Sequence, residues 1–183
     1  GAVNVALSPQ YMVNCFKNQQ GCGGGYDEPV WRDLMEIGTV PESCIPFQAS
    51  LGKCPTKCAN GGSLPKRTKA KNVYSPWGET DTARVEAIQR DIMTHGPVQS
   101  IFYTFSDFAE HRDSIYHRSM SATNTGAHAV RIIGWGTESG QDYWLVANSW
   151  GTDWKDGGFF KIRRGNNECN IEEEVVAGDP LLN

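Results

Sequence analysis

The feature that most constrains the fold is a change of sequence pattern near Trp77. Before this point apolar residues recur at helical spacing, and after it short β-branched or aromatic runs alternate with glycine-rich turns. A block of helices followed by a block of strands favours an α+β protein with segregated halves. We therefore predict a helical lobe over residues 1–77 and a strand-rich lobe over residues 78–183.

Local signals place the individual elements. Ser8 followed by Pro9 is typical of a helix N-terminus, and further helices are expected over residues 27–37 and 81–95, each followed by a glycine. The intervening residues 39–78 are expected to be loop-like. Five strands are predicted, over residues 98–105, 115–117, 128–135, 143–148 and 159–163.

Charge and hydropathy exclude several classes of partner. The net charge of −4 gives no reason to expect a nucleic acid or an anionic membrane surface. No apolar run approaches the roughly 20 residues of a transmembrane helix. The basic run over residues 65–71 is interpreted as a solvated loop, with polyanion binding as the alternative. Because the chain lacks an initiator Met, we expect a processed product or a cut piece of a longer chain.

Cysteine usage bears on the cellular compartment. Five of the six cysteines fall between Cys15 and Cys58, a clustering that is rare in cytosolic proteins outside metal sites. Four of them, Cys15, Cys44, Cys54 and Cys58, allow three disulfide pairings, and a zinc site is the competing interpretation.

The clearest candidate chemistry lies in two short segments. The sequence GAHAVRIIGWG over residues 126–136 delivers His128 to the start of a strand, and VANSWG follows at 146–151. An imidazole that takes and returns a proton needs a fixed tautomer, which the neutral amide of Asn148 can impose. Trp150 would cover that hydrogen bond. The competing interpretation is that His128 caps a strand and Asn148 lies in a turn.

The wider context of these segments resembles the papain-like cysteine peptidases. The supporting motifs are GCGGGY at 21–26, DYWLVANSWGTDWKDGGFFKIRRG at 142–165 and NECNIEEEVVAG at 167–178. The last of these, with GPV at 96–98 and SDF at 106–108, is similar to the cathepsin B branch. The resemblance runs from about Leu7 to Pro180, nearly the whole chain.

The resemblance implies a two-lobed fold, with a helical lobe, a β-barrel-like lobe and the active site in the cleft between them. It also implies peptide-bond hydrolysis by a cysteine thiolate, with His128 as general base and acid, Asn148 orienting it and Trp150 supporting it. The family signature C-G-[SA]-C-[WY] around the nucleophile is absent from this chain. The family spacing of about 130–150 residues between Cys and His places the nucleophile about 2–22 residues before Gly1. We therefore expect it on an upstream or light-chain segment.

The same resemblance assigns roles to the cysteines. It pairs Cys15 with Cys54 and Cys44 with Cys58, gives Cys22 a partner on the missing segment and leaves Cys169 without one. Cys169 as the nucleophile is disfavoured, because neighbouring carboxylates raise a thiol pKa. No metal or organic cofactor is implied.

Substrate-binding positions follow from the match residue by residue. Gly24 and Gly25 match residues whose backbone pairs with an extended peptide. Glu174 would favour Arg two residues before the cleaved bond, although a solvated carboxylate is the alternative. Ala127 stands before the histidine in place of the usual glycine. The other expected wall and pocket residues are Tyr26, Asp27, Ile101, Phe102, Ala129 and Trp150.

One departure from cathepsin B affects the expected activity. Only nine residues, 45–53, separate Cys44 from Cys54, and none is His. The insertion that blocks one end of the cleft in that branch is therefore expected to be missing. We predict a cysteine endopeptidase of a lysosome, vacuole or secretory route, acting on peptides or proteins. The alternatives are a non-catalytic matrix or adhesion relative with its nucleophile replaced, and an isolated fragment without a function of its own.

Overall fold

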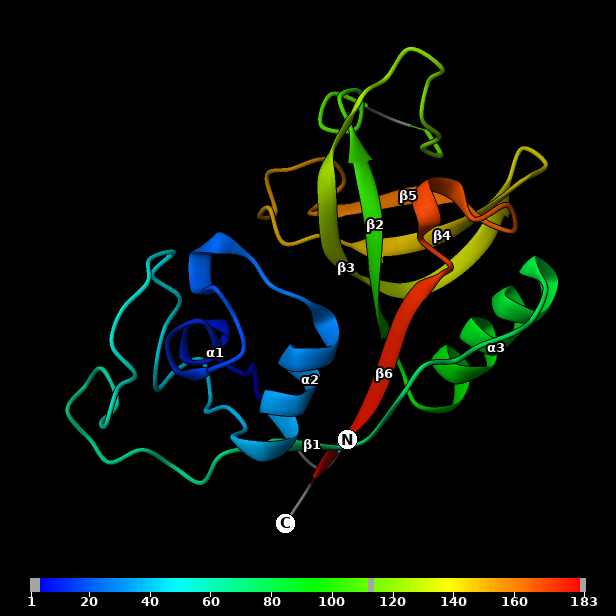
Figure 1. Cartoon of the computed structure of the whole chain (residues 1–183). Helices are drawn as coiled ribbons and strands as arrows, with labels where there is room; N and C mark the ends of the chain where they lie inside the picture. Colours follow the sequence, from blue (N-terminus) through cyan, green and yellow to red (C-terminus); the bar gives the residue numbers. More distant parts are fainter. Residues whose placement is uncertain (1–3, 112–113, 182–183) are drawn as a thin grey trace. The chain divides into compact units, whose positions relative to one another are not determined.

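A computed structural model describes residues 4–111 and 114–181, and the chain divides into two units (Figure 1). The first unit holds the residues up to Val73 together with the segment that starts at Gly178, and the second holds Tyr74–Ala177. The sequence interpretation placed the boundary after residue 77 and left the C-terminus in the second lobe. The C-terminal segment belongs to the first unit because the last strand extends to pair with a strand there.

Helix α1, Pro9–Cys15, begins where the sequence predicted. The Ser8 hydroxyl accepts a hydrogen bond from the backbone N–H of Tyr11 at 2.9 Å, which satisfies one of the free N–H groups of the first turn. The same hydroxyl donates to the carbonyl of Ile45 at 2.6 Å. Ser8 is fully buried, so this one side chain both caps the helix and fixes a distant loop against it.

Helix α2, Asp27–Glu36, also confirms a predicted element, and Gly38 follows it at a left-handed φ of 73°. A buried carboxylate, that of Asp33, accepts from the backbone N–H groups of Lys17 and Asn18 at 3.0 and 3.1 Å. These bonds anchor the loop that leads into the short 3₁₀ helix η1, Gly21–Gly23. Helix α2 therefore determines where the glycine-rich segment at 21–25 runs.

Two disulfides, Cys15–Cys54 and Cys44–Cys58, hold the loop-rich part of this unit. They match the pairing implied by the family resemblance and rule out the zinc interpretation of these four cysteines. Within the described residues no group of three or more His, Cys, Asp or Glu side chains is placed to hold a metal. The small core around the bridges contains Tyr11, Val40 and Ile45.

The second unit contains helix α3, Asp81–Thr94, and most of an antiparallel sheet. The strand order is β1-β6-β2-β3-β4-β5, and within the described residues the sheet is open rather than closed into a barrel. The strands are β1 (Lys69–Tyr74), β2 (Val98–Phe105), β3 (Asn124–Glu138), β4 (Gln141–Ala147), β5 (Phe159–Arg163) and β6 (Glu174–Leu181).

The predicted strands match β2 and β5 at both ends, whereas β3 is longer than expected. Residues 115–117 form only an isolated bridge, from Tyr116 to Ile162. Two strands, β1 and β6, were missed, and β1 lies in the segment expected to be a loop. Neither shows a sustained alternation of β-branched or aromatic residues, so their pairing depends on tertiary neighbours.

The core of the second unit is formed by α3 and the sheet, and it also includes Phe108 and Tyr116. Its fully buried members include Ile88 of α3, Val98 and Phe102 of β2, Ile132 of β3 and Trp144 of β4. No helix in the described part of the chain is both long and apolar enough to cross a membrane.

Candidate active site

His128 lies on β3, directly opposite Phe102 of β2 in the antiparallel register. Its imidazole is half-buried. Behind it, the Phe102 ring is fully buried, with a centroid separation of 6.1 Å and an interplanar angle of 63°. The sheet therefore supplies a rigid apolar backing on one side of the imidazole.

Asn148 immediately follows β4, at the point where the chain leaves the sheet. Its backbone N–H donates to the carbonyl of Gly158 at 3.0 Å. Its side-chain Oδ1 lies 2.8 Å from Nε2 of His128 and also accepts from the backbone N–H of Ser149 at 2.8 Å. The bond from Ser149 N–H identifies this atom as the amide oxygen, which has no hydrogen to donate. Oδ1 therefore accepts the hydrogen bond from the imidazole as well. The Nε2 position then carries a proton and Nδ1 is left to exchange one.

Gly158 is needed for this arrangement. Its φ is +91°, and a Cβ built on it would stand 2.9 Å from the carbonyl oxygen of Gly151. Its N–H donates to Trp154 O at 2.7 Å while its carbonyl receives Asn148 N–H. The sequence analysis did not single out this glycine. The sequence signal that could have identified Gly158 is its place in the loop that follows Trp150 and Gly151.

Trp150 is the second aromatic ring beside the imidazole. The two rings have centroids 5.1 Å apart and are tilted by 32°, and 42% of the Trp150 surface is exposed. The indole therefore lies beside the imidazole and remains partly open to solvent. His128, Asn148 and Trp150, which the sequence singled out together, are brought together in the structure.

The two cysteines outside the disulfides differ in environment. Cys22 is exposed in the first unit, whereas Cys169 is buried in the second. Burial, followed by the charge of Glu168, raises the pKa of the Cys169 thiol to about 12. A thiol with this pKa is almost entirely protonated at neutral pH, so Cys169 is a poor nucleophile. The sequence argument named only the carboxylates, and burial is the larger cause.

Several expected substrate-binding residues occupy facing positions on three neighbouring strands. Ile101 of β2 pairs with Ala129 of β3 on one side and with Glu174 of β6 on the other. Residues directly opposite in a sheet point to the same face, so these three side chains share one surface. Ala127, opposite Tyr103, lies two residues further along the same face of β3.

Phe102 requires a correction. It was expected to line the substrate side, but it is fully buried and points to the opposite face from Ile101, its neighbour along the strand. Its observed contacts are with core rings and with the His128 imidazole. Phe102 therefore supports the histidine from inside the core and does not reach the surface.

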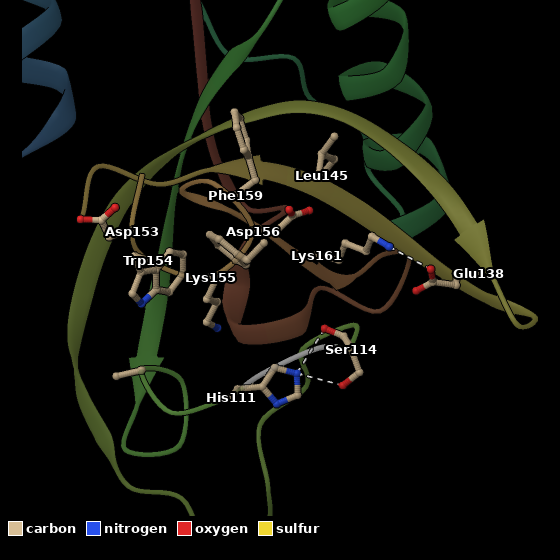
Figure 2. A pocket seen from close by; sticks show the side chains of 12 residues that line it. His111, Ser114, Glu138, Leu145, Asp153, Trp154, Lys155, Asp156, Phe159 and Lys161 are labelled. Atoms are coloured by element: carbon tan, nitrogen blue, oxygen red, sulfur yellow. Dashed lines mark hydrogen bonds and ion pairs between the residues drawn. The ribbon is translucent and has the colours of Figure 1, made fainter. Parts of the chain in front are cut away.

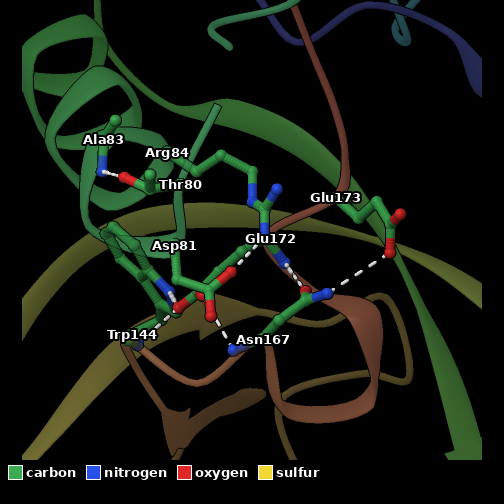
Figure 3. Close-up of polar contacts among 9 residues, drawn as sticks. Thr80, Asp81, Ala83, Arg84, Trp144, Asn167, Glu172 and Glu173 are labelled. Atoms are coloured by element: carbon green, nitrogen blue, oxygen red, sulfur yellow. Dashed lines mark hydrogen bonds and ion pairs between the residues drawn. The ribbon is translucent and has the colours of Figure 1, made fainter. Parts of the chain in front are cut away.

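The start of β6, and with it Glu174, is anchored by a buried carboxylate that the sequence did not single out (Figure 3). Glu172 is 1% exposed and accepts three hydrogen bonds. The donors are Trp144 Nε1 at 2.9 Å, Gly165 N at 2.6 Å and Asn167 N at 2.9 Å. Within the EEE run at 172–174, the first carboxylate is thus structural, and Glu173 and Glu174 are exposed.

The remaining expected residues lie in the first unit. Gly24 has a φ of +101° with open space where a Cβ would be. At Gly25 a Cβ would fall 1.5 Å from Oε1 of Gln19. That Gln19 oxygen accepts from Tyr26 N at 3.2 Å, and its amide donates to Tyr26 O at 3.3 Å. The local reason for Gly25 is therefore the close Gln19 side chain, which sequence reasoning missed. Tyr26 is 75% exposed, and Asp27 begins α2.

Comparison with known proteins identifies the family of this chain. The family model described as papain family cysteine protease matches residues 1–178. The chain therefore belongs to the papain family of cysteine proteases. Its relatives within that family include cathepsin B-like proteases. "Cathepsin B-like CP3" of Giardia intestinalis is 40% identical over 179 residues, covering 95% of this chain and 58% of that protein. "Cathepsin B-like protease 1" of Arabidopsis thaliana is 37% identical over 191 residues, covering 97% and 50%.

A solved structure supports the same assignment. Procathepsin B S9 from Trypanosoma congolense superimposes with a TM-score of 0.90 at 31% identity, covering all of this chain and 63% of that one. These values establish the papain-like α+β fold. The chain spans little more than half the length of the relatives it matches.

Proposed function

We propose that this chain carries the histidine and asparagine of a cathepsin B-like cysteine endopeptidase. The observation that supports this most directly is the 2.8 Å hydrogen bond between His128 Nε2 and Asn148 Oδ1. It holds the imidazole in one tautomer and directs Nδ1 toward proton exchange. A neutral amide does this without neutralising the imidazolium that the reaction forms.

In the proposed reaction, Nδ1 of His128 takes the proton of a cysteine thiol supplied by a segment upstream of Gly1. The thiolate attacks the peptide carbonyl carbon, and the imidazolium returns the proton to the departing amine nitrogen. His128 then takes a proton from water, the hydroxide attacks the thioester, and the carboxylic acid leaves as the thiol is restored. Cys22, an exposed free thiol, is the proposed disulfide partner of that segment.

Endopeptidase rather than dipeptide-trimming activity is supported by the short loop at 45–53. Gln10 donates to the carbonyl of Ser50 at 2.7 Å and accepts from Gln48 N at 2.8 Å. Asn14 accepts from Gly52 N at 2.8 Å. A disulfide at each end and these bonds along its length hold the loop against α1. We propose that a loop held in this way does not block a bound substrate.

Substrate selection is proposed to involve the face shared by Ile101, Ala129 and Glu174. The Glu174 carboxylate would favour Arg two residues before the cleaved bond through direct charge pairing. Gly24 and Gly25 would pair with the extended peptide backbone, flanked by Tyr26 and Asp27. The two disulfides support a lysosomal, vacuolar or secreted location.

The test begins with intact masses of the full-length product, measured before and after reduction. The proposal is supported if reduction releases a peptide with the C-G-[SA]-C-[WY] signature. It is supported further if the protein cleaves a fluorogenic peptide that has Arg two residues before the cleaved bond. His128→Ala should abolish that cleavage, whereas His117→Ala, a change at an exposed histidine, should preserve it. A serine at the nucleophile position would instead indicate a non-catalytic matrix or adhesion relative.

A further inference from the structure

Lys155 has an unusual backbone conformation for its residue type. Its φ is +45°, in the left-handed region that favours glycine, and it lies in the loop that connects Trp154 to Gly157 and Gly158. A residue with a Cβ adopts this region at a cost in backbone strain. Such a conformation persists because the surrounding structure holds it, so the surroundings of the Lys155 side chain are of interest.

The contacts of the Lys155 ammonium include aromatic rings and the carbonyl of Phe108. Nζ donates to the carbonyl of Phe108 at 3.1 Å and lies 4.4 Å from the centroid of the Phe108 ring. Nζ also lies 4.5 Å from the centroid of the Trp154 ring. Lys155 and Trp154 both line a surface cavity of about 640 Å³ (Figure 2). A cation over two ring faces is attracted by both of their quadrupoles.

The same two rings hold Trp150. Phe108 meets Trp150 edge-on at a centroid distance of 5.7 Å, and Trp154 meets it edge-on at 5.0 Å. Trp150 in turn lies over the His128 imidazole at 5.1 Å. A continuous series of contacts therefore runs from the Lys155 ammonium through two rings to the indole that covers the histidine.

We propose that Lys155 is a positioning residue of the active site, whose ammonium fixes Phe108 and Trp154 so that they hold Trp150 over His128. Its catalytic consequence rests on the proposed protease function. The placement of the Trp150 indole does not depend on that function. The positioning role of Lys155 and the protease function can therefore be tested separately.

Lys161 provides a matched control. It too is a lysine at this cavity, pairing with Glu138 at 2.9 Å and lying 5.0 Å from the Tyr143 ring (Figure 2). Among the described residues the rings against Trp150 are those of Phe108, His128 and Trp154, and Tyr143 is not one of them. Lys161→Met removes a cation from the same cavity without touching the proposed series of contacts.

The first measurement is the NMR signal of the His128 Hε1 proton in protein carrying ¹³C-labelled histidine, assigned by its loss in His128→Gln. Because the Trp150 ring lies 5.1 Å from the imidazole, we expect its ring current to shift this proton. We expect Lys155→Met to move the signal toward its position in Trp150→Leu, Lys155→Arg to retain it, and Lys161→Met to leave it unchanged. A Lys155→Met signal at the wild-type position, or an equal shift in Lys161→Met, would overturn the proposal.

Lys155→Gly guards against a variant that fails to fold, because it removes the cation and relieves the positive φ together. It should give the same His128 shift as Lys155→Met while remaining folded. An unshifted signal in the folded glycine variant would also overturn the proposal.

In the full-length enzyme, Lys155→Met should lower kcat by about two- to fivefold, the equivalent of a partly exposed cation–π contact, with KM unchanged. If the wild-type enzyme cleaves no peptide, the proposed protease function fails and the NMR result still decides the role of Lys155. If the wild type cleaves and the Lys155 variants alter neither kcat nor the His128 signal, the positioning role fails while the protease function stands.

Discussion

The side chain of Asn148 offers the sharpest test of the proposed catalytic geometry. Asn148→Ala removes the acceptor that lies 2.8 Å from His128 Nε2 and 2.8 Å from Ser149 N. The imidazole would then be free to rotate and to adopt either tautomer. A hydrogen bond to a charged group is worth about 1.5–3 kcal/mol, and the bond to His128 has this character once the imidazolium forms. At about 1.4 kcal/mol per factor of ten, its loss predicts a fall in kcat of about 10- to 150-fold.

The assay is steady-state cleavage of a fluorogenic peptide by the full-length enzyme, with urea unfolding measured alongside. The lost bond to Ser149 should lower the free energy of unfolding by about 0.5–1.5 kcal/mol, which leaves the variant folded. Asn60→Ala is the matched control, because Asn60 Oδ1 also accepts from a backbone N–H, that of Gly62 at 2.9 Å, and lies in the other unit. An unchanged kcat in folded Asn148→Ala, or a loss confined to KM, would refute the reasoning.

Three further outcomes follow from local geometry. Gly158→Ala should lower the free energy of unfolding more than Gly165→Ala in urea titrations, because both have φ near +90° but only Gly158 meets a backbone oxygen at 2.9 Å. Strain alone costs about 1–3 kcal/mol, so equal losses would contradict the steric argument. Glu172→Ala should cost at least about 3 kcal/mol by leaving three donors without their acceptor, whereas Glu173→Ala, at an exposed position, should cost under about 0.5 kcal/mol. Burial and the Glu168 charge raise the pKa of Cys169 to about 12. The thiol should therefore resist iodoacetamide at pH 8 and react only as the pH rises toward that value, as followed by mass spectrometry. Rapid labelling of the folded protein at pH 8 would show this prediction to be wrong.

The elements that local sequence predicted best are those with strong local signals. Ser8 and Pro9 mark the start of α1, and the spacing of β-branched and aromatic residues marks β2 and β5. The sequence missed β1 and β6 because a strand without strong alternation is stabilised by its neighbours in the sheet. No local pattern reports which neighbour that will be.

The candidate site divides in the same way. The sequence by itself determined the chemical types, since an imidazole, an amide and an indole occur in motifs specific enough to indicate one family. Only the tertiary structure decided how they act. It placed Phe102 behind the imidazole in the core, made Glu172 a buried anchor, and connected Lys155 to Trp150 through two rings. Burial and contact between residues distant in sequence depend on how the strands and loops pack, and residue order along the chain does not encode that packing in any local pattern.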